Sequence, residues 1–217
     1  KEQVELFQGL SIWEDRKYQA LQGTYPVISL SFAAVKESCF SEARKSICRI
    51  IAEQYKKKDF LLDSDRLDAQ EKASYREISA NMSDSAASFS LHQLCGFLSR
   101  HYRKKVIVLL DEYDTPMQEA YVNGYWEELA AFIRNLFNAT FKTNPCLERA
   151  IMTGITRISR ESIFSDLNNL EVVTTTSGKY ETSFGFTQEE VWAALEEDGL
   201  AGQKEQVRAW YDGFTCG

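Results

Sequence analysis

The 217-residue sequence lacks the features of a membrane or secreted protein. No run of apolar residues approaches the roughly 20 that a membrane-spanning helix needs. The N-terminal residues 1–6, Lys-Glu-Gln-Val-Glu-Leu, lack the apolar core of a secretory signal peptide. We therefore expect no membrane association and a cytoplasmic location.

Cysteine and histidine are too few and too scattered for a disulfide framework or a zinc site. The two histidines, His92 and His101, fall in one expected helix, so cysteine–histidine catalysis and a histidine-bound metal are disfavoured. The cysteines are odd in number and form no Cys-x-x-Cys pair, which indicates buried reduced thiols. The five are Cys39, Cys48, Cys95, Cys146 and Cys216.

The sequence also has fewer positively charged than negatively charged residues. The chain has 25 Lys and Arg against 32 Asp and Glu, giving a net charge of −7 and an isoelectric point near 5.1. This balance does not suit a surface that neutralises many phosphates, so we expect no direct nucleic-acid binding. The basic runs 56–58 and 100–105 fall at the C-terminal ends of expected helices, where cations complement the helix dipole.

The sequence does contain an alternation of strand-like and helix-like segments. Residues 27–32, Val-Ile-Ser-Leu-Ser-Phe, alternate like a strand with one buried face, and the five aliphatics 106–110 suit a central parallel strand. Residues 150–155 are a further expected strand. Amphipathic spacing predicts helices at about 36–55, at 90–102 after a Ser90–Gln93 capping box, and at 126–141. This order predicts an α/β fold with a parallel sheet flanked by helices.

The pattern changes from mixed strands and helices to helices near Phe186. A capping box at residues 187–190, Thr-Gln-Glu-Glu, opens one expected helix, and a final helix is expected at about 203–211. No Pro-rich or Ser-rich linker separates the two parts. We expect residues 1–185 to form a core and residues 186–217 to begin a helical lid.

The strongest chemical signal is a pair of carboxylates at the end of the central strand. Asp111 and Glu112 follow the aliphatic run 106–110 directly, and open α/β sheets bind ligands at this edge. In the Walker B arrangement the Asp holds Mg²⁺, usually through water, and the Glu polarises the attacking water. The alternative is a buried strand that ends in ordinary acidic loop residues.

Two further residues could complete such a site. Thr153, in the strand 150–155, could report on a γ-phosphate from the neighbouring strand, or its hydroxyl could simply bond to backbone. Arg157, just past that strand, could stabilise charge on phosphate oxygens or form a surface salt bridge.

The companion phosphate-binding pattern, G-x-x-x-x-G-K-[ST], occurs nowhere in the chain. The one Gly-Lys pair, Gly178-Lys179, is followed by Tyr180 instead of Ser or Thr. Without the backbone N–H cradle and its Lys, we expect severely reduced affinity for nucleotide phosphates.

The acidic motif belongs to a longer series of matches. Residues 109–116, Leu-Leu-Asp-Glu-Tyr-Asp-Thr-Pro, and 153–159, Thr-Gly-Ile-Thr-Arg-Ile-Ser, resemble the AAA-ATPase-like family of bacterial proteins. Further matches follow in order, so the resemblance covers most of the second half of the chain; they lie at 161–169, 184–191 and 210–214. In this family a Walker A segment precedes a region similar to residues 6–10, so we expect the chain to begin just after it. Many members continue into a PD-(D/E)XK nuclease-like domain, for which this sequence is too short.

The resemblance implies a P-loop NTPase-like sheet that lacks its Walker A strand. It implies that the complete protein binds and hydrolyses ATP with Mg²⁺, whereas no cofactor is expected on this chain alone. The site residues that it implies are Asp111 as the Mg²⁺ carboxylate, Glu112 as the catalytic base, Thr153 as the sensor, Arg157 as a further catalytic residue and Asp114 as a further cofactor-binding residue.

Another function stays open at this point. A nucleotide-independent protein-interaction scaffold could keep the same fold and bind an unidentified protein partner, and an upstream Gly-Lys-Ser/Thr loop would favour the ATPase. A free-standing nuclease is disfavoured because residues 111–114 lack a nearby Glu-x-Lys. A missing Walker A strand would leave one edge of the strand 150–155 unpaired. We expect residues 172–176 to pair there, or two chains to associate as a homodimer.

Overall fold

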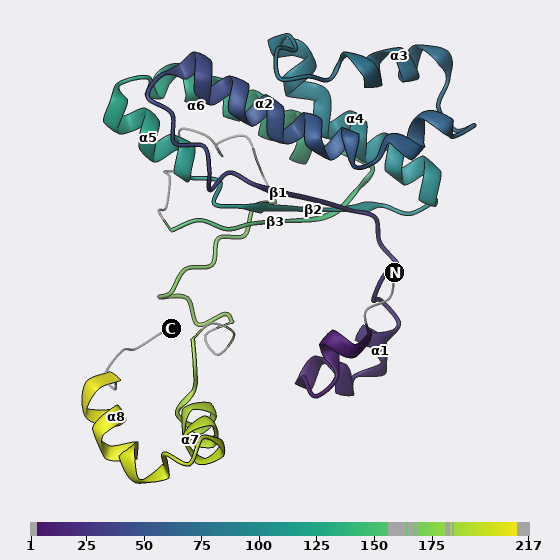
Figure 1. Ribbon diagram of the computed structural model, residues 1–217. Helices are drawn as coiled ribbons and strands as arrows, with labels where there is room; N and C mark the ends of the chain where they lie inside the picture. The colour runs from purple at the N-terminus through teal and green to yellow at the C-terminus, as the bar shows by residue number, and fades with distance from the viewer. Residues whose placement is uncertain are drawn as a thin grey trace. The chain divides into compact units, whose positions relative to one another are not determined.

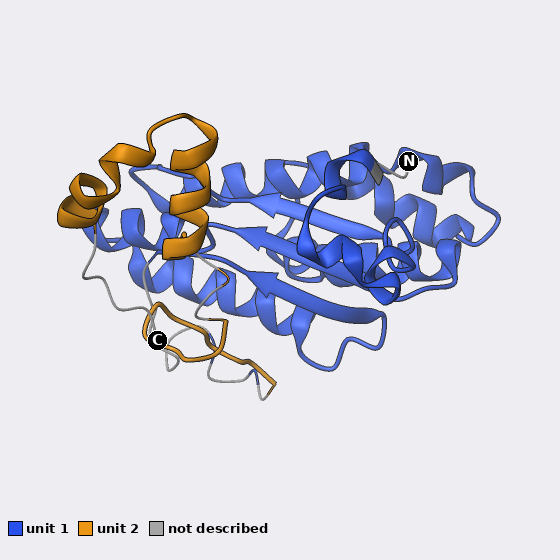
Figure 2. Ribbon diagram, turned by 90° about the horizontal axis from the view of Figure 1, so that it is seen from below, with its two compact units in different colours: residues 1–168 blue, residues 169–217 orange. Residues whose placement is uncertain are grey.

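The computed structural model describes residues 4–155, 164, 167, 169–180, 183 and 185–211. The chain divides into two compact units, residues 1–168 and 169–217, which Figure 2 draws in different colours. Each unit is described on its own. The expected division into a core that ends at residue 185 and a helical lid stays a prediction.

The first unit is built on a three-stranded parallel sheet in the order β1-β2-β3 (Figure 1). β2 pairs with β1 from Val27↔Ile107 to Ser31↔Asp111, and with β3 on its other side. This arrangement confirms the predicted α/β fold with a parallel sheet. The strands are β1 (Val27–Ser31), β2 (Val106–Asp111) and β3 (Leu147–Met152).

Helices cover one face of this sheet (Figure 1). The layer against the sheet consists of α2 (Phe40–Lys56), α4 (Asp84–Tyr102) and α6 (Trp126–Phe141), with α5 (Thr115–Asn123) leading into α6. The remaining short elements of this unit are η1 (Val4–Phe7), η2 (Ser11–Glu14), α1 (Arg16–Gln19), η3 (Asp59–Asp63) and α3 (Ala69–Glu77).

The hydrophobic core lies between the sheet and this helical layer. Alternate strand residues point into it, and the core-facing side chains of β1 and β2 are Ile28, Leu30, Val106, Val108 and Leu110, all at most 3% exposed. The helices supply the opposite wall with fully or almost fully buried aliphatic residues, among them Ile47, Ile51, Leu94, Leu129 and Ile133. Each such side chain stabilises the fold by roughly 1.5–3 kcal/mol.

The predicted capping box at Ser90 is wrong, because α4 begins earlier. Ser83 is the N-cap, and its hydroxyl accepts a hydrogen bond from the backbone N–H of Ala86 at 3.2 Å. Ser90 is fully buried inside the helix and donates its hydroxyl to the carbonyl of Ala87 at 2.6 Å. A serine hydroxyl can bond within a helix as well as cap it, so the Ser-x-x-Gln pattern could not locate the start.

β3 is an edge strand within the described residues, and the expected partner at 172–176 is wrong. Those residues form irregular backbone that leads into a turn, in which the N–H of Ser177 donates to the carbonyl of Thr174 at 2.9 Å. The hydroxyl of Ser177 also accepts from the N–H of Thr174 at 2.9 Å. Such local side-chain bonds compete with strand pairing, which explains why the β-branched composition of these residues wrongly predicted a strand. The homodimer across β3 stays a prediction.

The second unit contains α7 (Gln188–Glu197), η4 (Ala201–Gln203) and α8 (Lys204–Tyr211). The predicted capping box is confirmed. The hydroxyl of Thr187 accepts from the N–H of Glu190 at 3.3 Å, and the Glu190 carboxylate accepts from the N–H of Thr187 at 2.7 Å. Capping of this kind fixes where a helix starts.

The cysteines only partly match the expectation of buried thiols. Cys48 and Cys95 are buried, and burial raises the pKa of both, that of Cys95 to about 12. Cys39 is the N-cap of α2 and is exposed, and a hydrogen bond to Ser41 lowers its pKa. Among the described helices, none combines the length and the apolar composition needed to cross a bilayer.

Candidate functional site

The three strands bring polar side chains together at the carboxyl edge of the sheet. Asp111 is the last residue of β2 and pairs in register with Ser31 of β1. The hydroxyl of Thr153 donates to Asp111 Oδ1 at 2.6 Å, and the hydroxyl of Ser31 lies 3.3 Å from Asp111 Oδ2 as a weaker donor. Both oxygens of the Asp111 carboxylate are therefore oriented by the neighbouring strands.

The alternation of β2 explains why Asp111 is accessible. Val106, Val108 and Leu110 fill the face that the helices cover, so the next residue of the strand points to the opposite face. Asp111, Ser31 and Thr153 are all exposed on this side. The structure brings Asp111 and Thr153 together at one sheet edge and places a solvent-facing carboxylate between two hydroxyls.

Thr153 is held in place by backbone pairing that continues beyond β3. The N–H of Thr153 donates to the carbonyl of Leu110 at 2.9 Å, and the carbonyl of Thr153 accepts from the N–H of Tyr113 at 3.0 Å. β3 itself starts at Leu147 and ends at Met152, earlier than the predicted strand. Even so, residue 153 is fixed as if it were part of the sheet.

Glu112 adopts a left-handed backbone conformation with φ of 49°. For a residue other than glycine this costs of order 1–3 kcal/mol, and such strain is common at functional sites. Its carboxylate accepts a hydrogen bond from the hydroxyl of Thr115 at 2.9 Å, at the first residue of α5. The sharp turn thus directs the Glu112 side chain to the start of α5 instead of into the sheet.

The remaining acidic residue of the motif, Asp114, is fully buried. Its Oδ2 accepts from the side-chain amide of Gln118 at 2.9 Å. The other side of the carboxylate faces Gly154, where an added Cβ would lie 2.5 Å from Asp114 Oδ1. Direct contact with a cofactor would require the segment around Gly154 to move.

Comparison with known sequences identifies a family whose model covers the residues of this cluster. The sequence model of the family described as "Predicted AAA-ATPase" matches residues 1–164, which include the whole cluster. The chain belongs to this AAA-ATPase-like family.

A relative from Azotobacter chroococcum mcd 1, described as "Uncharacterized protein in vnfD 5'region", is 30% identical over 113 residues. The match covers 52% of this chain and 22% of that protein, so the chain matches only about a fifth of the relative's length. No solved structure matches the chain significantly. The family therefore identifies an ATPase-like domain, and the residue roles have to be argued from the site itself.

The donor set of this AAA-ATPase-like domain fits Mg²⁺. The ion prefers oxygen ligands, keeps several waters and is usually bound through one or two carboxylates plus phosphates, and Asp111 offers an exposed, oriented carboxylate. No three His, Cys, Asp or Glu side chains converge within the described residues, so an all-protein metal cage is not present there. Arg157, the further predicted catalytic residue, lies outside the described residues.

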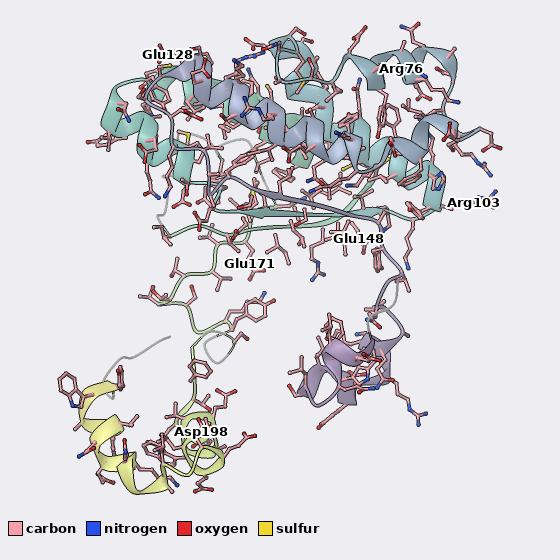
Figure 3. All side chains as sticks on the ribbon, in the orientation of Figure 1. Arg76, Arg103, Glu128, Glu148, Glu171 and Asp198 are labelled. Carbon is pink, nitrogen blue, oxygen red and sulfur yellow. The ribbon has the colours of Figure 1, made fainter. Side chains whose placement is uncertain are left out.

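Other charged residues lie at the amino-terminal ends of the strands, opposite the carboxyl edge that carries the candidate site. Arg103 is the C-cap of α4, just before β2, and Glu148 is the second residue of β3, so both belong to the amino-terminal end of the strands (Figure 3). Arg100 and His101 occupy the last turn of α4, as expected for cations at a helix C-terminus. The basic run 100–105 therefore lies at the start of β2, at the opposite end of that strand from Asp111.

Ser31 is the residue that sequence reasoning missed. It was visible as the last serine of the alternating segment 27–32, on the same strand face as Ser29. Only the register Ser31↔Asp111 shows that it reaches the acidic motif. A comparison of where adjacent parallel strands end would have identified Ser31 as a neighbour of Asp111.

We expect the Thr153 hydroxyl to be energetically coupled to Asp111. In a double-mutant cycle with Thr153→Val and Asp111→Ala, the coupling should be about 1 kcal/mol, the usual net value of one hydrogen bond. Urea unfolding of the unmodified chain, the two single variants and the double variant measures it. The matched cycle with Ser31→Ala should give clearly less, because that contact is 3.3 Å long. Equal coupling in both cycles would contradict the described geometry.

Proposed function

We propose that the chain supplies the Mg²⁺-binding and water-activating end of an ATPase site in a larger AAA-ATPase-like protein. The observation that supports this proposal is the Asp111 carboxylate at the carboxyl edge of the central strand, hydrogen-bonded at 2.6 Å to Thr153 beyond the adjacent strand. Ligands of open α/β sheets bind at this edge.

Each residue of the cluster has a distinct role in the proposal. Asp111 binds the ion directly or through water, and Thr153 keeps the carboxylate oriented and acts as the sensor residue. Glu112, anchored by Thr115, accepts a proton from the attacking water. When bound, Mg²⁺ neutralises charge on the phosphate oxygens. Arg157 is retained as a second source of positive charge.

The phosphate cradle must come from residues outside this sequence, which contains no Gly-Lys-Ser/Thr segment. We therefore expect the chain alone to bind Mg²⁺·ATP no more tightly than about 1 mM, or about −4 kcal/mol, and to hydrolyse none. Isothermal titration calorimetry with and without Mg²⁺ measures this. Micromolar affinity would show that the phosphate site lies elsewhere on the chain.

The rival function is a nucleotide-independent scaffold that binds a protein partner. Its support is the sheet face away from the helices, where Val27 is 41% and Ile151 52% exposed, together with the edge position of β3. Pairing of two chains along β3 belongs to the same idea. Light scattering should then give a dimer mass that falls to a monomer when Ile151 is replaced by Lys. A monomer at high concentration would refute the pairing.

A further inference from the structure

Asp114 and Gly154 fit against each other too closely to be independent. A Cβ built on Gly154 would lie 2.5 Å from Asp114 Oδ1, 2.8 Å from its Cγ and 3.0 Å from Cε1 of Tyr113. Separations below 3.0 Å force atoms to shift, and Asp114 is fully buried and bonded to Gln118. The carboxylate therefore has no simple way to give room to a side chain at position 154.

The same contact lies next to Thr153. Backbone bonds fix Thr153 from both sides, through the carbonyl of Leu110 and the N–H of Tyr113. Tyr113 and Asp114 then close over Gly154, the next residue of the chain. Any displacement of Gly154 would therefore move the Thr153 hydroxyl away from Asp111 Oδ1.

Asp114 also ties α5 to this arrangement. Its carbonyl accepts from the N–H groups of Met117 and Gln118, both at 3.0 Å, and the Gln118 side chain returns to its carboxylate. One residue thus connects the end of β2, the start of α5 and the segment after β3. Burying a carboxylate is costly, so a position that needed only volume would be filled better by an apolar side chain.

We propose that Asp114 is a positioning residue: with Gly154 it forms a lock that holds the Thr153 hydroxyl on the Asp111 carboxylate. This inference rests on the proposed function, because it assigns the lock to the Mg²⁺ site. It gives Asp114 an indirect role in place of the cofactor contact expected from the sequence. The lock is defined by contact geometry, so it can be tested separately from ion binding.

The test compares four variants of the full chain for the lock, and a fifth, Asp111→Asn, for the ion site itself. Gly154→Ala and Asp114→Ala break the lock, and Asp114→Asn keeps the shape of the side chain and an oxygen that accepts from Gln118. Gly96→Ala is the matched control, since a Cβ at Gly96 in α4 meets no atom within 4 Å. Thermal unfolding checks that each variant folds. If one of the two lock-breaking variants does not fold, the other one carries the comparison with Asp114→Asn and Gly96→Ala.

Two readouts are used. Amide hydrogen exchange of Tyr113 and Thr153, followed by NMR, should accelerate about 10-fold or more in Gly154→Ala and Asp114→Ala, as expected for locally destabilised bonds. Binding of Mn²⁺, the probe for the Mg²⁺ site, should weaken about 10-fold in the same variants, as when the outer-shell support of a metal ligand is removed. Asp114→Asn and Gly96→Ala should stay within about 3-fold of the unmodified chain in both readouts.

The outcomes test the positioning role of Asp114 separately from the proposed Mg²⁺ site on which it rests. If Gly154→Ala exchanges as slowly as Gly96→Ala, the lock does not exist. If Asp114→Asn loses Mn²⁺ as completely as Asp114→Ala while exchange is unchanged, Asp114 is itself a ligand and the positioning role is wrong. If the unmodified chain and Asp111→Asn bind Mn²⁺ equally, the proposed function fails, and the exchange data still decide the lock.

Discussion

Replacing Glu112 by Gln should lower ATP hydrolysis by at least about 100-fold and leave ATP binding almost unchanged, in a protein where this chain is joined to an intact phosphate-binding loop. The Gln side chain keeps the size of Glu and an oxygen that accepts from Thr115, so the turn at residue 112 is preserved. What is lost is the carboxylate that accepts a proton from water. General-base catalysis typically contributes 10²- to 10⁴-fold.

The measurement is steady-state phosphate release together with equilibrium nucleotide binding. Glu128→Gln is the matched control, because this substitution removes the same charge from an exposed residue of α6 in the helical layer (Figure 3). That control should keep its hydrolysis rate. If Glu112→Gln hydrolyses ATP as fast as Glu128→Gln, the catalytic base lies elsewhere. If both variants also bind a protein partner as well as the unmodified protein does, the scaffold function is favoured.

The central strand and its acidic end could be predicted because β2 carries its own signal. Five aliphatic residues exceed what an exposed strand would contain, and they end at Asp111. The amphipathic spacing of α6 was equally informative, and the predicted range 126–141 matches its bounds. Signals of this kind are local, so they need no knowledge of what packs against them.

The start of β3 could not be predicted in the same way. Glu148 and Arg149 are exposed on an edge strand, so the first half of β3 has a polar sequence and lies outside the predicted strand 150–155. Edge strands lack the continuous apolar character of central ones, and charged side chains are common there. The predicted strand therefore began at residue 150, where the apolar residues begin.

The contacts that complete the candidate site were also beyond the sequence. Ser31 reaches Asp111 through strand register, and Gly154 meets Asp114 through a turn that starts at Glu112 with φ of 49°. A one-residue change of register would place Ser31 on the other face of the sheet. Motifs identify which residues have suitable chemistry, whereas register decides which of them meet.

Replacing Phe137 by Ala should destabilise the first unit by about 3–5 kcal/mol, the usual cost of removing a large buried aromatic side chain. Phe137 is fully buried in α6, and its ring stacks on Phe164 at a centroid distance of 6.0 Å. Phe164 in turn packs edge-on against Tyr113 at 5.4 Å, so the cavity would open beside the residue that closes over Gly154.

Urea unfolding should show a lower midpoint with an unchanged slope for Phe137→Ala. Phe89→Ala is the control, because Phe89 in α4 is 53% exposed and its loss should change stability by no more than about 0.5 kcal/mol. The amide of Tyr113 should also exchange faster in Phe137→Ala than the loss of global stability explains. If exchange follows global stability alone, the aromatic contacts support the fold without supporting the site.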